Sequence, residues 1–147
     1  MAASSWKQKS GTLYRGDVKD GVALPVPDAE KSLVRHILYL EGYGRTTPYL
    51  STSESKDTAS HFAGTTGHVY EGTPRTWPSQ NVAHRSRREL LQLLRGKGHG
   101  DAKWNSAFEV LRAYQYVEEH LEHLADFSST TPKDNDDLTS IVSSILA

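Results

Sequence analysis

The chain has 147 residues, of which 36% are hydrophobic and 24% are charged, and its formal net charge is −1. This length suits one domain with a core of its own and is short for two domains. The lack of cysteine excludes disulfides and thiolate metal sites, and no apolar run approaches the roughly 18 residues of a membrane span. Because the start lacks the apolar core of a secretory signal, we expect a cytoplasmic protein, or one delivered into a target cell's cytoplasm, with no membrane partner.

The first half of the chain predicts short strands alternating with helices. Apolar residues spaced by three and four positions indicate helices with one buried face, and Asp28 is a suitable N-cap for the first of them. The second helix is expected to bury Ala59, Phe62 and Ala63. In chain order the expected elements are a loose N-terminus at 1–10, a strand at 11–16, a helix at 29–41, a strand at 47–52, and a helix from Ser53 or Ser55 to about Ala63.

The second half predicts more helix. Ser86-Arg87-Arg88-Glu89 and Ser106-Ala107-Phe108-Glu109 both have the spacing of a capping box, in which a hydroxyl and a carboxylate cap a helix N-terminus. The second of these helices is expected to continue to about Leu124. The remaining expected elements are a strand at 67–71, an irregular stretch from Pro74 to His84, a linker-like segment at 128–137, and an amphipathic segment at 138–146 that docks as a helix or contacts a partner.

Two short motifs suggest chemistry. Arg15 lies at the end of the first expected strand, and a guanidinium can hold a phosphate with two parallel hydrogen bonds. Ser51-Thr52-Ser53 lies where a strand turns into a helix, and such a corner exposes hydroxyls and backbone N–H groups to a ligand. Each motif also has an ordinary explanation, since surface arginines and helix N-caps are common.

Together these motifs resemble the first two parts of the Arg–Ser–Glu signature of ADP-ribosyltransferases. The aromatic–Arg–Gly form of Tyr14-Arg15-Gly16 matches, as do Thr-Pro-Tyr before the serine motif and Ala-x-x-Phe-Ala after it. The resemblance implies a single α+β domain over residues 11–127, with a small split β-sheet flanked by helices and NAD in a central cleft. Residues 128–147 would then be a linker and a short C-terminal amphipathic segment.

The resemblance also implies the roles of individual residues. Arg15 and Ser51 would be catalytic, together with a glutamate, and NAD would be a substrate with no metal required. Tyr49, Tyr43 or Phe62 would stack on the nicotinamide ring. The NAD-binding residues implied are Tyr14, Arg15, Gly16, Tyr49, Ser51, Thr52, Ser53 and Phe62.

The catalytic glutamate is where the chain departs from the family, because the Glu-x-Glu or Gln-x-Glu pair expected on a later strand is absent. Glu109 is favoured as the catalytic residue because it follows the glycine-rich loop 96–100. A glutamate at the third position of a capping box also has a purely structural role, which is to cap the helix. Glu71 and Glu89 remain alternatives. Glu118, Glu119, Glu122, His120 and His123 are all expected on the last long helix, where the two histidines would share a face.

A carboxylate is required because cleavage of the nicotinamide–ribose bond develops positive charge on the ribose, as in glycoside cleavage. A fixed anion stabilises that charge, and the same group can act as a base toward the acceptor. By the resemblance, the protein would transfer ADP-ribose from NAD to a macromolecule and release nicotinamide.

Small members of this kind are often toxins of toxin–antitoxin or phage-defence systems, so a neutralising antitoxin or immunity protein is an implied partner, with 128–147 as its candidate contact. Six basic residues between His84 and Lys103 favour RNA or DNA slightly over protein as the acceptor, although ordinary surface charge gives the same pattern. Two alternatives remain open. One is a non-catalytic NAD-binding module on the same fold, and the other is a nucleic-acid-binding protein acting through the segment 85–103.

Overall fold

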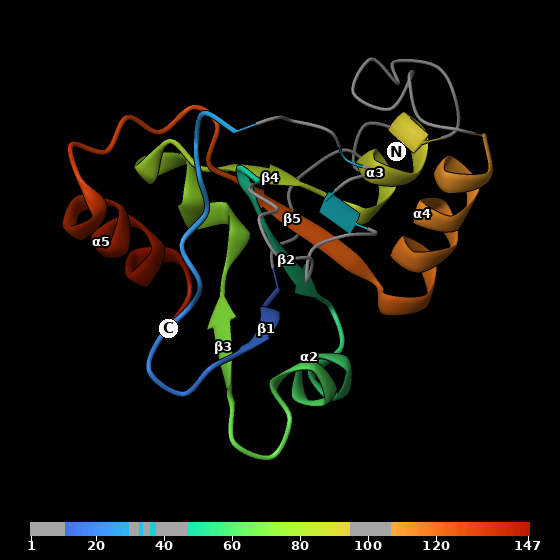
Figure 1. The fold of residues 1–147 in the computed structure, drawn as a ribbon, viewed down its shortest axis with the longest axis horizontal. Coiled ribbons are helices and arrows are strands. Elements are labelled where there is room, and N and C mark those ends of the chain that lie inside the picture. The colour runs from blue at the N-terminus through green and yellow to red at the C-terminus, as the bar shows by residue number, and fades with distance from the viewer. Residues whose placement is uncertain (1–10, 30–32, 34–35, 38–46, 95–106) are drawn as a thin grey trace.

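The computed structural model describes residues 11–29, 33, 36–37, 47–94 and 107–147, and it shows an α+β fold (Figure 1). Within these residues one antiparallel sheet has the strand order β3-β1-β2-β5-β4. Its strands are β1 (Leu13–Asp17), β2 (Tyr49–Ser53), β3 (His68–Gly72), β4 (Ala83–Arg85) and β5 (Glu122–Asp126). The helices are α2 (Lys56–Ala63), the 3-10 helix η2 (Pro74–Gln80), α3 (Arg87–Leu94), α4 (Ala107–His120) and α5 (Asn135–Ile145).

The sheet opens between its first two strands. β1 pairs with β3 over five residue pairs, and β2 pairs with β5 over five, but β1 and β2 share only the pair Tyr14 with Ser53. Arg15 and Ser51 lie beyond that pair, so the parts of β1 and β2 that carry them are not paired with each other. The sheet is therefore divided into β3–β1 and β2–β5–β4, joined at one point.

Two apolar cores lie on opposite faces of this sheet. Successive residues of a strand point to opposite faces, so Leu124 joins one core while Ala125 joins the other. Figure 1 shows α5 on one side of the sheet and α3 and α4 on the other. The α5 core contains Leu13, Leu50, Trp77, Val82, Ala125, Phe127, Leu138, Val142, Ile145 and Leu146. The opposite core contains Leu33, Ile37, Tyr49, Leu90, Leu94, Ala113, Val117 and Leu124.

The C-terminal segment belongs to the domain core. The Asp134 side chain accepts a hydrogen bond from the Asp137 N–H at 2.8 Å and so caps α5, the helix expected at 138–146. The apolar face of α5 is buried against the sheet and η2, and the backbone of Ala147 pairs with that of Glu71 at 2.9 Å. That apolar face is therefore covered by the domain itself and not by a partner.

The N-cap of helix α2 is Ser55, one of the two caps that the sequence allows, and its hydroxyl accepts a hydrogen bond from the Thr58 N–H at 3.1 Å. The helix lies against β1, and a Cβ added at Gly16 would come within 1.9 Å of the carbonyl oxygen of Ala59. Glycine at this position therefore permits the close approach of helix and strand. Phe62, expected to be buried, is instead 44% exposed, because it lies beside the opening between the strands.

The expected continuation of the last long helix to Leu124 is wrong. Helix α4 ends at His120, Leu121 takes a positive φ of 49°, and the chain turns back as β5. Every residue of β5 is buried, so this central strand shows no alternation of polar and apolar residues. The helix was expected to continue because Leu121 and Leu124 keep the apolar spacing of α4 in the sequence, although neither residue is in a helix.

The stretch from Pro74 to His84, expected to be irregular, contains the 3-10 helix η2 and the start of the short strand β4. The helix expected at 29–41 falls mostly outside the described residues, of which Leu33, His36 and Ile37 are helical and buried. The capping residue Ser106 also lies outside them. In the described part of the chain, no helix is both long and apolar enough to cross a membrane.

We predict that Gly16→Ala lowers the free energy of unfolding by about 1–3 kcal/mol or more, since backbone atoms of α2 would have to move away from β1. Urea unfolding followed by circular dichroism measures this. Ser60→Ala, on the exposed side of the same helix, is the control and should change stability little. Equal stability of the two variants would contradict the close approach of Gly16 to α2.

Candidate active site

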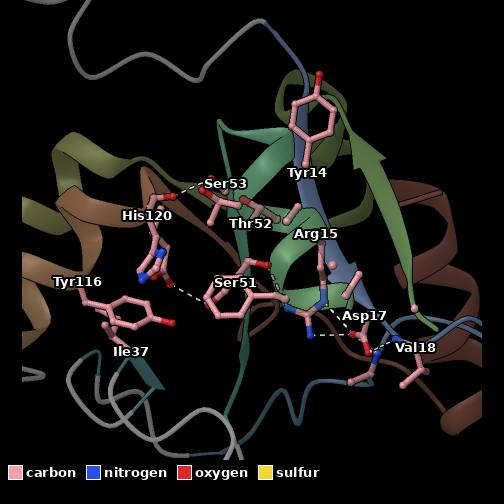
Figure 2. Close-up of a pocket in the computed structure, with 18 of the residues that line it drawn as sticks. Tyr14, Arg15, Asp17, Val18, Ile37, Ser51, Thr52, Ser53, Tyr116 and His120 are labelled. Carbon is pink, nitrogen blue, oxygen red and sulfur yellow. Dashed lines mark hydrogen bonds and ion pairs between the residues drawn. The ribbon is translucent and has the colours of Figure 1, made fainter. Parts of the chain in front are cut away.

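A cavity of about 500 Å³ opens where β1 and β2 separate (Figure 2). Pockets for small ligands usually enclose roughly 300–1,000 Å³. It is bounded by α2 on one side and by the end of α4 on the other, and its described lining comes mainly from β1, β2, β5, both of these helices and the helical residue Ile37. Its lining includes Tyr14, Arg15, Gly16, Asp17, Ser51, Thr52, Ser53, Phe62, Tyr116, His120 and Glu122.

Arg15 is held in a fixed orientation at the cavity. Its Nε and Nη2 atoms donate to Oδ2 of Asp17 at 3.0 and 2.8 Å, and its Nη1 donates to the carbonyl oxygen of Ser51 at 3.0 Å. The Asp17 carboxylate also accepts the backbone N–H groups of Val18 and Ala23. These three contacts use three of the five N–H groups of the guanidinium, and the other two have no hydrogen-bond partner among the described residues.

Glu122 is a buried carboxyl group at the base of the same cavity. It is the first residue of β5, it is 2% exposed, and its Oε2 accepts a hydrogen bond from the Ser51 hydroxyl at 2.7 Å. Burial raises the pKa of Glu122 to about 7, although the Ser51 hydrogen bond and the positive charge of Arg15 act in the opposite direction. A carboxyl group in a cleft with so large a shift is a candidate for proton chemistry.

The other two hydroxyls of the serine motif hold the corner that positions Glu122. Ser53 donates to the carbonyl oxygen of His120 at 2.6 Å, and Thr52 donates to that of His123 at 2.9 Å. The backbone N–H of Glu54 donates to the carbonyl oxygen of Leu121 at 3.1 Å. The turn from α4 into β5 is therefore fastened to β2 on both sides of Glu122.

Most of the predicted NAD-binding residues do lie together. Tyr14, Arg15, Gly16, Ser51, Thr52, Ser53 and Phe62 all line the cavity. Tyr49 does not, because its side chain is buried in the core on the α3–α4 side of the sheet. Tyr43 lies outside the described residues.

Glu71 and Glu89, the two alternatives to Glu109 as the catalytic glutamate, are not brought to this cavity. Glu109 is on α4, but its side chain lies outside the described part of the structure. Glu71 is exposed on β3, and Glu89 forms an ion pair with Arg85 at 3.1 Å. Glu122 was missed because it was expected on a helix, and no glycine, proline or asparagine in the sequence marks the end of α4.

His120 and His123 do not share a helix face. His120 lines the cavity, whereas His123 is on β5, where its Nε2 is 2.7 Å from Oε2 of Glu54 and its Nδ1 is 2.8 Å from Nε2 of His84. Glu54 also accepts a hydrogen bond from Arg87 at 3.0 Å. Burial would raise the pKa of Glu54, but the hydrogen bonds from His123 and Arg87 outweigh it and lower that pKa.

Two arginines of the basic segment, Arg85 and Arg87, have acidic partners. Arg85 forms ion pairs with Asp126 at 2.9 Å and with Glu89 at 3.1 Å, and Arg87 pairs with Glu54. Although partial burial lowers the pKa of Arg85, the charge of Asp126 raises it overall. These side chains therefore offer less charge to a phosphate backbone than the sequence alone indicates.

Among the described residues, no group of three or more histidine, aspartate or glutamate side chains is arranged to hold a metal ion. No protein-family model, curated protein or solved structure matches the chain. The geometry of the cavity and the motif resemblance are therefore the basis for the function proposed below.

We predict that burial of Glu122 makes the domain less stable as the pH rises. Between the ordinary glutamate pKa of 4.5 and the folded-state pKa of about 7, the folded state holds the proton more tightly than the unfolded state, so the free energy of unfolding falls with rising pH. The loss is nearly complete at about pH 8 and amounts to about 3 kcal/mol at most.

Glu122→Gln removes this penalty, so the variant should be more stable than the wild type at pH 8 and similar to it near pH 4. Urea unfolding at pH 4, 6 and 8 measures the difference. Glu118→Gln, at an exposed position on α4, is the matched control and should leave the pH dependence unchanged. A stability difference for Glu122→Gln that did not vary with pH would exclude a buried, titrating carboxyl group.

Proposed function

We propose that the protein is a mono-ADP-ribosyltransferase, which transfers ADP-ribose from NAD to a macromolecular acceptor and releases nicotinamide. The observation that supports this best is the meeting of Arg15, Ser51 and Glu122, from three different strands, at one cavity. Their order along the chain is that of the Arg–Ser–Glu signature. Glu122 takes the place of Glu109 as the proposed catalytic glutamate.

Each of these residues has a role that its chemistry supports. Arg15 would bind the diphosphate of NAD through the N–H groups that Asp17 and Ser51 leave available. Ionised Glu122 would stabilise the positive charge that develops on the ribose as the nicotinamide bond breaks, and Ser51 would orient its carboxylate. Phe62 offers an exposed ring at the cavity for a planar group.

For the acceptor, we favour RNA or DNA over protein because of the rings at the cavity. The Phe62 and His120 rings are 5.3 Å apart between centroids, and those of His120 and Tyr116 are 4.2 Å apart. Aromatic side chains of this kind stack on bases of any sequence. The basic segment contributes less to this argument, since Arg85 and Arg87 are paired with carboxylates.

A toxin with this activity would act in the cytoplasm and would be neutralised by an antitoxin or immunity protein. Because the apolar face of α5 is buried in the domain, such a partner would contact other surfaces than that face. The alternative is a non-catalytic module that binds NAD at the same cavity. Release of nicotinamide distinguishes the enzyme from that module.

The test is incubation of the protein with NAD labelled in the ADP-ribose part and a cell lysate, followed by separation of nucleic acid from protein. We predict that Glu122→Gln and Arg15→Ala lower the rate of labelling by about 10²–10³-fold, because each removes charge stabilisation from the site. Glu109→Gln is the matched control and should label at the wild-type rate.

Label in the nucleic-acid fraction would identify the favoured acceptor class, and label in the protein fraction would correct it. Loss of activity in Glu109→Gln with full activity in Glu122→Gln would overturn the assignment of the glutamate. If the folded wild-type protein bound NAD but released no nicotinamide with any lysate, the non-catalytic alternative would replace the transferase.

A further inference from the structure

A line of hydrogen bonds leads from the cavity to a buried histidine. The Ser51 hydroxyl that donates to Glu122 is also 2.7 Å from Nε2 of His36, and Nδ1 of His36 is 2.8 Å from the hydroxyl oxygen of Thr47. The backbone N–H of Tyr49 donates to the same Thr47 oxygen at 3.2 Å. Four side chains, from Thr47 to Glu122, are thus joined in one chain of contacts.

The direction of each hydrogen bond follows from the number of protons available. An ionised Glu122 only accepts, so the single hydroxyl proton of Ser51 must point to it. The proton between Ser51 and His36 must then come from Nε2 of His36. Nδ1 of that ring is left as an acceptor, and it takes the hydroxyl proton of Thr47.

Neutral imidazole suits this arrangement, since it carries one donor and one acceptor. His36 is 2% exposed, and burial followed by the nearby charge of Arg15 lowers its pKa to about 3. The ring therefore stays neutral at the pH at which Glu122 ionises. Its edge lies against Tyr49, with centroids 5.4 Å apart, which further limits its rotation.

We propose that His36 is a positioning residue of the active site: its Nε2 proton holds the Ser51 hydroxyl directed at Glu122 and so fixes the catalytic carboxylate. As a role in catalysis this rests on the proposed transferase function, but the hydrogen-bond polarity does not depend on it. Among the described residues, the other charged or titratable side chains at the cavity are Arg15, Asp17 and Tyr14 of β1, and Tyr116 and His120 of α4.

The first test needs no variant and no NAD. Nitrogen NMR of histidine-labelled wild-type protein distinguishes the two neutral tautomers of imidazole. At pH 8 we expect His36 to be neutral with its proton on Nε2. A proton on Nδ1, or a charged ring, would overturn the proposal whatever the protein catalyses.

The second test compares His36→Leu, which fills space without a donor, with His36→Gln, whose amide nitrogen can donate to Ser51. In His36→Leu we expect kcat to fall by about 10–100-fold, the cost of a misplaced catalytic group, with little change in KM for NAD. His36→Gln should recover most of that loss. Equal effects of the two changes, or a change in KM alone, would overturn the role of the Nε2 donor.

Carbon NMR of the Glu122 carboxyl group separates failure of this inference from failure of the transferase. Loss of the donor should weaken the Ser51 hydrogen bond, so the titration midpoint of Glu122 should rise in His36→Leu and not in His36→Gln. If these midpoints behave as expected but the wild type transfers no ADP-ribose, the positioning contact stands and the proposed function fails. Unchanged midpoints in both variants would refute the contact itself.

Discussion

The contact between the Arg15 guanidinium and the carbonyl oxygen of Ser51 spans the gap in the sheet, and the candidate site depends on it. Beyond the pair Tyr14 with Ser53, the two strands have no ladder hydrogen bonds to each other. Backbone N–H and C=O groups that lack ladder hydrogen bonds need other hydrogen-bond partners. One side chain satisfies the Ser51 carbonyl, leaves room for a cavity, and brings a positive charge to it.

That positive charge acts in the same direction on the two buried titratable groups beside it, since it favours the deprotonated form of each. Burial has the larger effect on both. It lowers the pKa of His36, which the charge lowers further, and it raises the pKa of Glu122, which the charge opposes. Asp17 limits the effect by pairing with the same guanidinium. The electrostatics of the site thus depend on burial and on one cation beside three ionisable groups.

Arg15 and the Ser51–Ser53 motif could be predicted from the sequence because their signals are local. Each lies within a few residues of a strand end, and Ser55 caps the following helix by the usual spacing. Glu122 and His36 could not, since their roles arise from the pairing of β2 with β5 and from contacts across the sheet. The strand β5 could not be predicted because the chain reverses at Leu121, which takes a positive φ although leucine rarely does so.

Helix α5 supplies buried side chains to one core but contributes no residue to the cavity lining. A domain divided between Thr130 and Asp134 would depend on association of the two fragments for half of its apolar core. The amount of folded protein would then depend on the concentration of the α5 peptide by mass action. Adding or withholding that peptide would therefore control the folding of the whole domain.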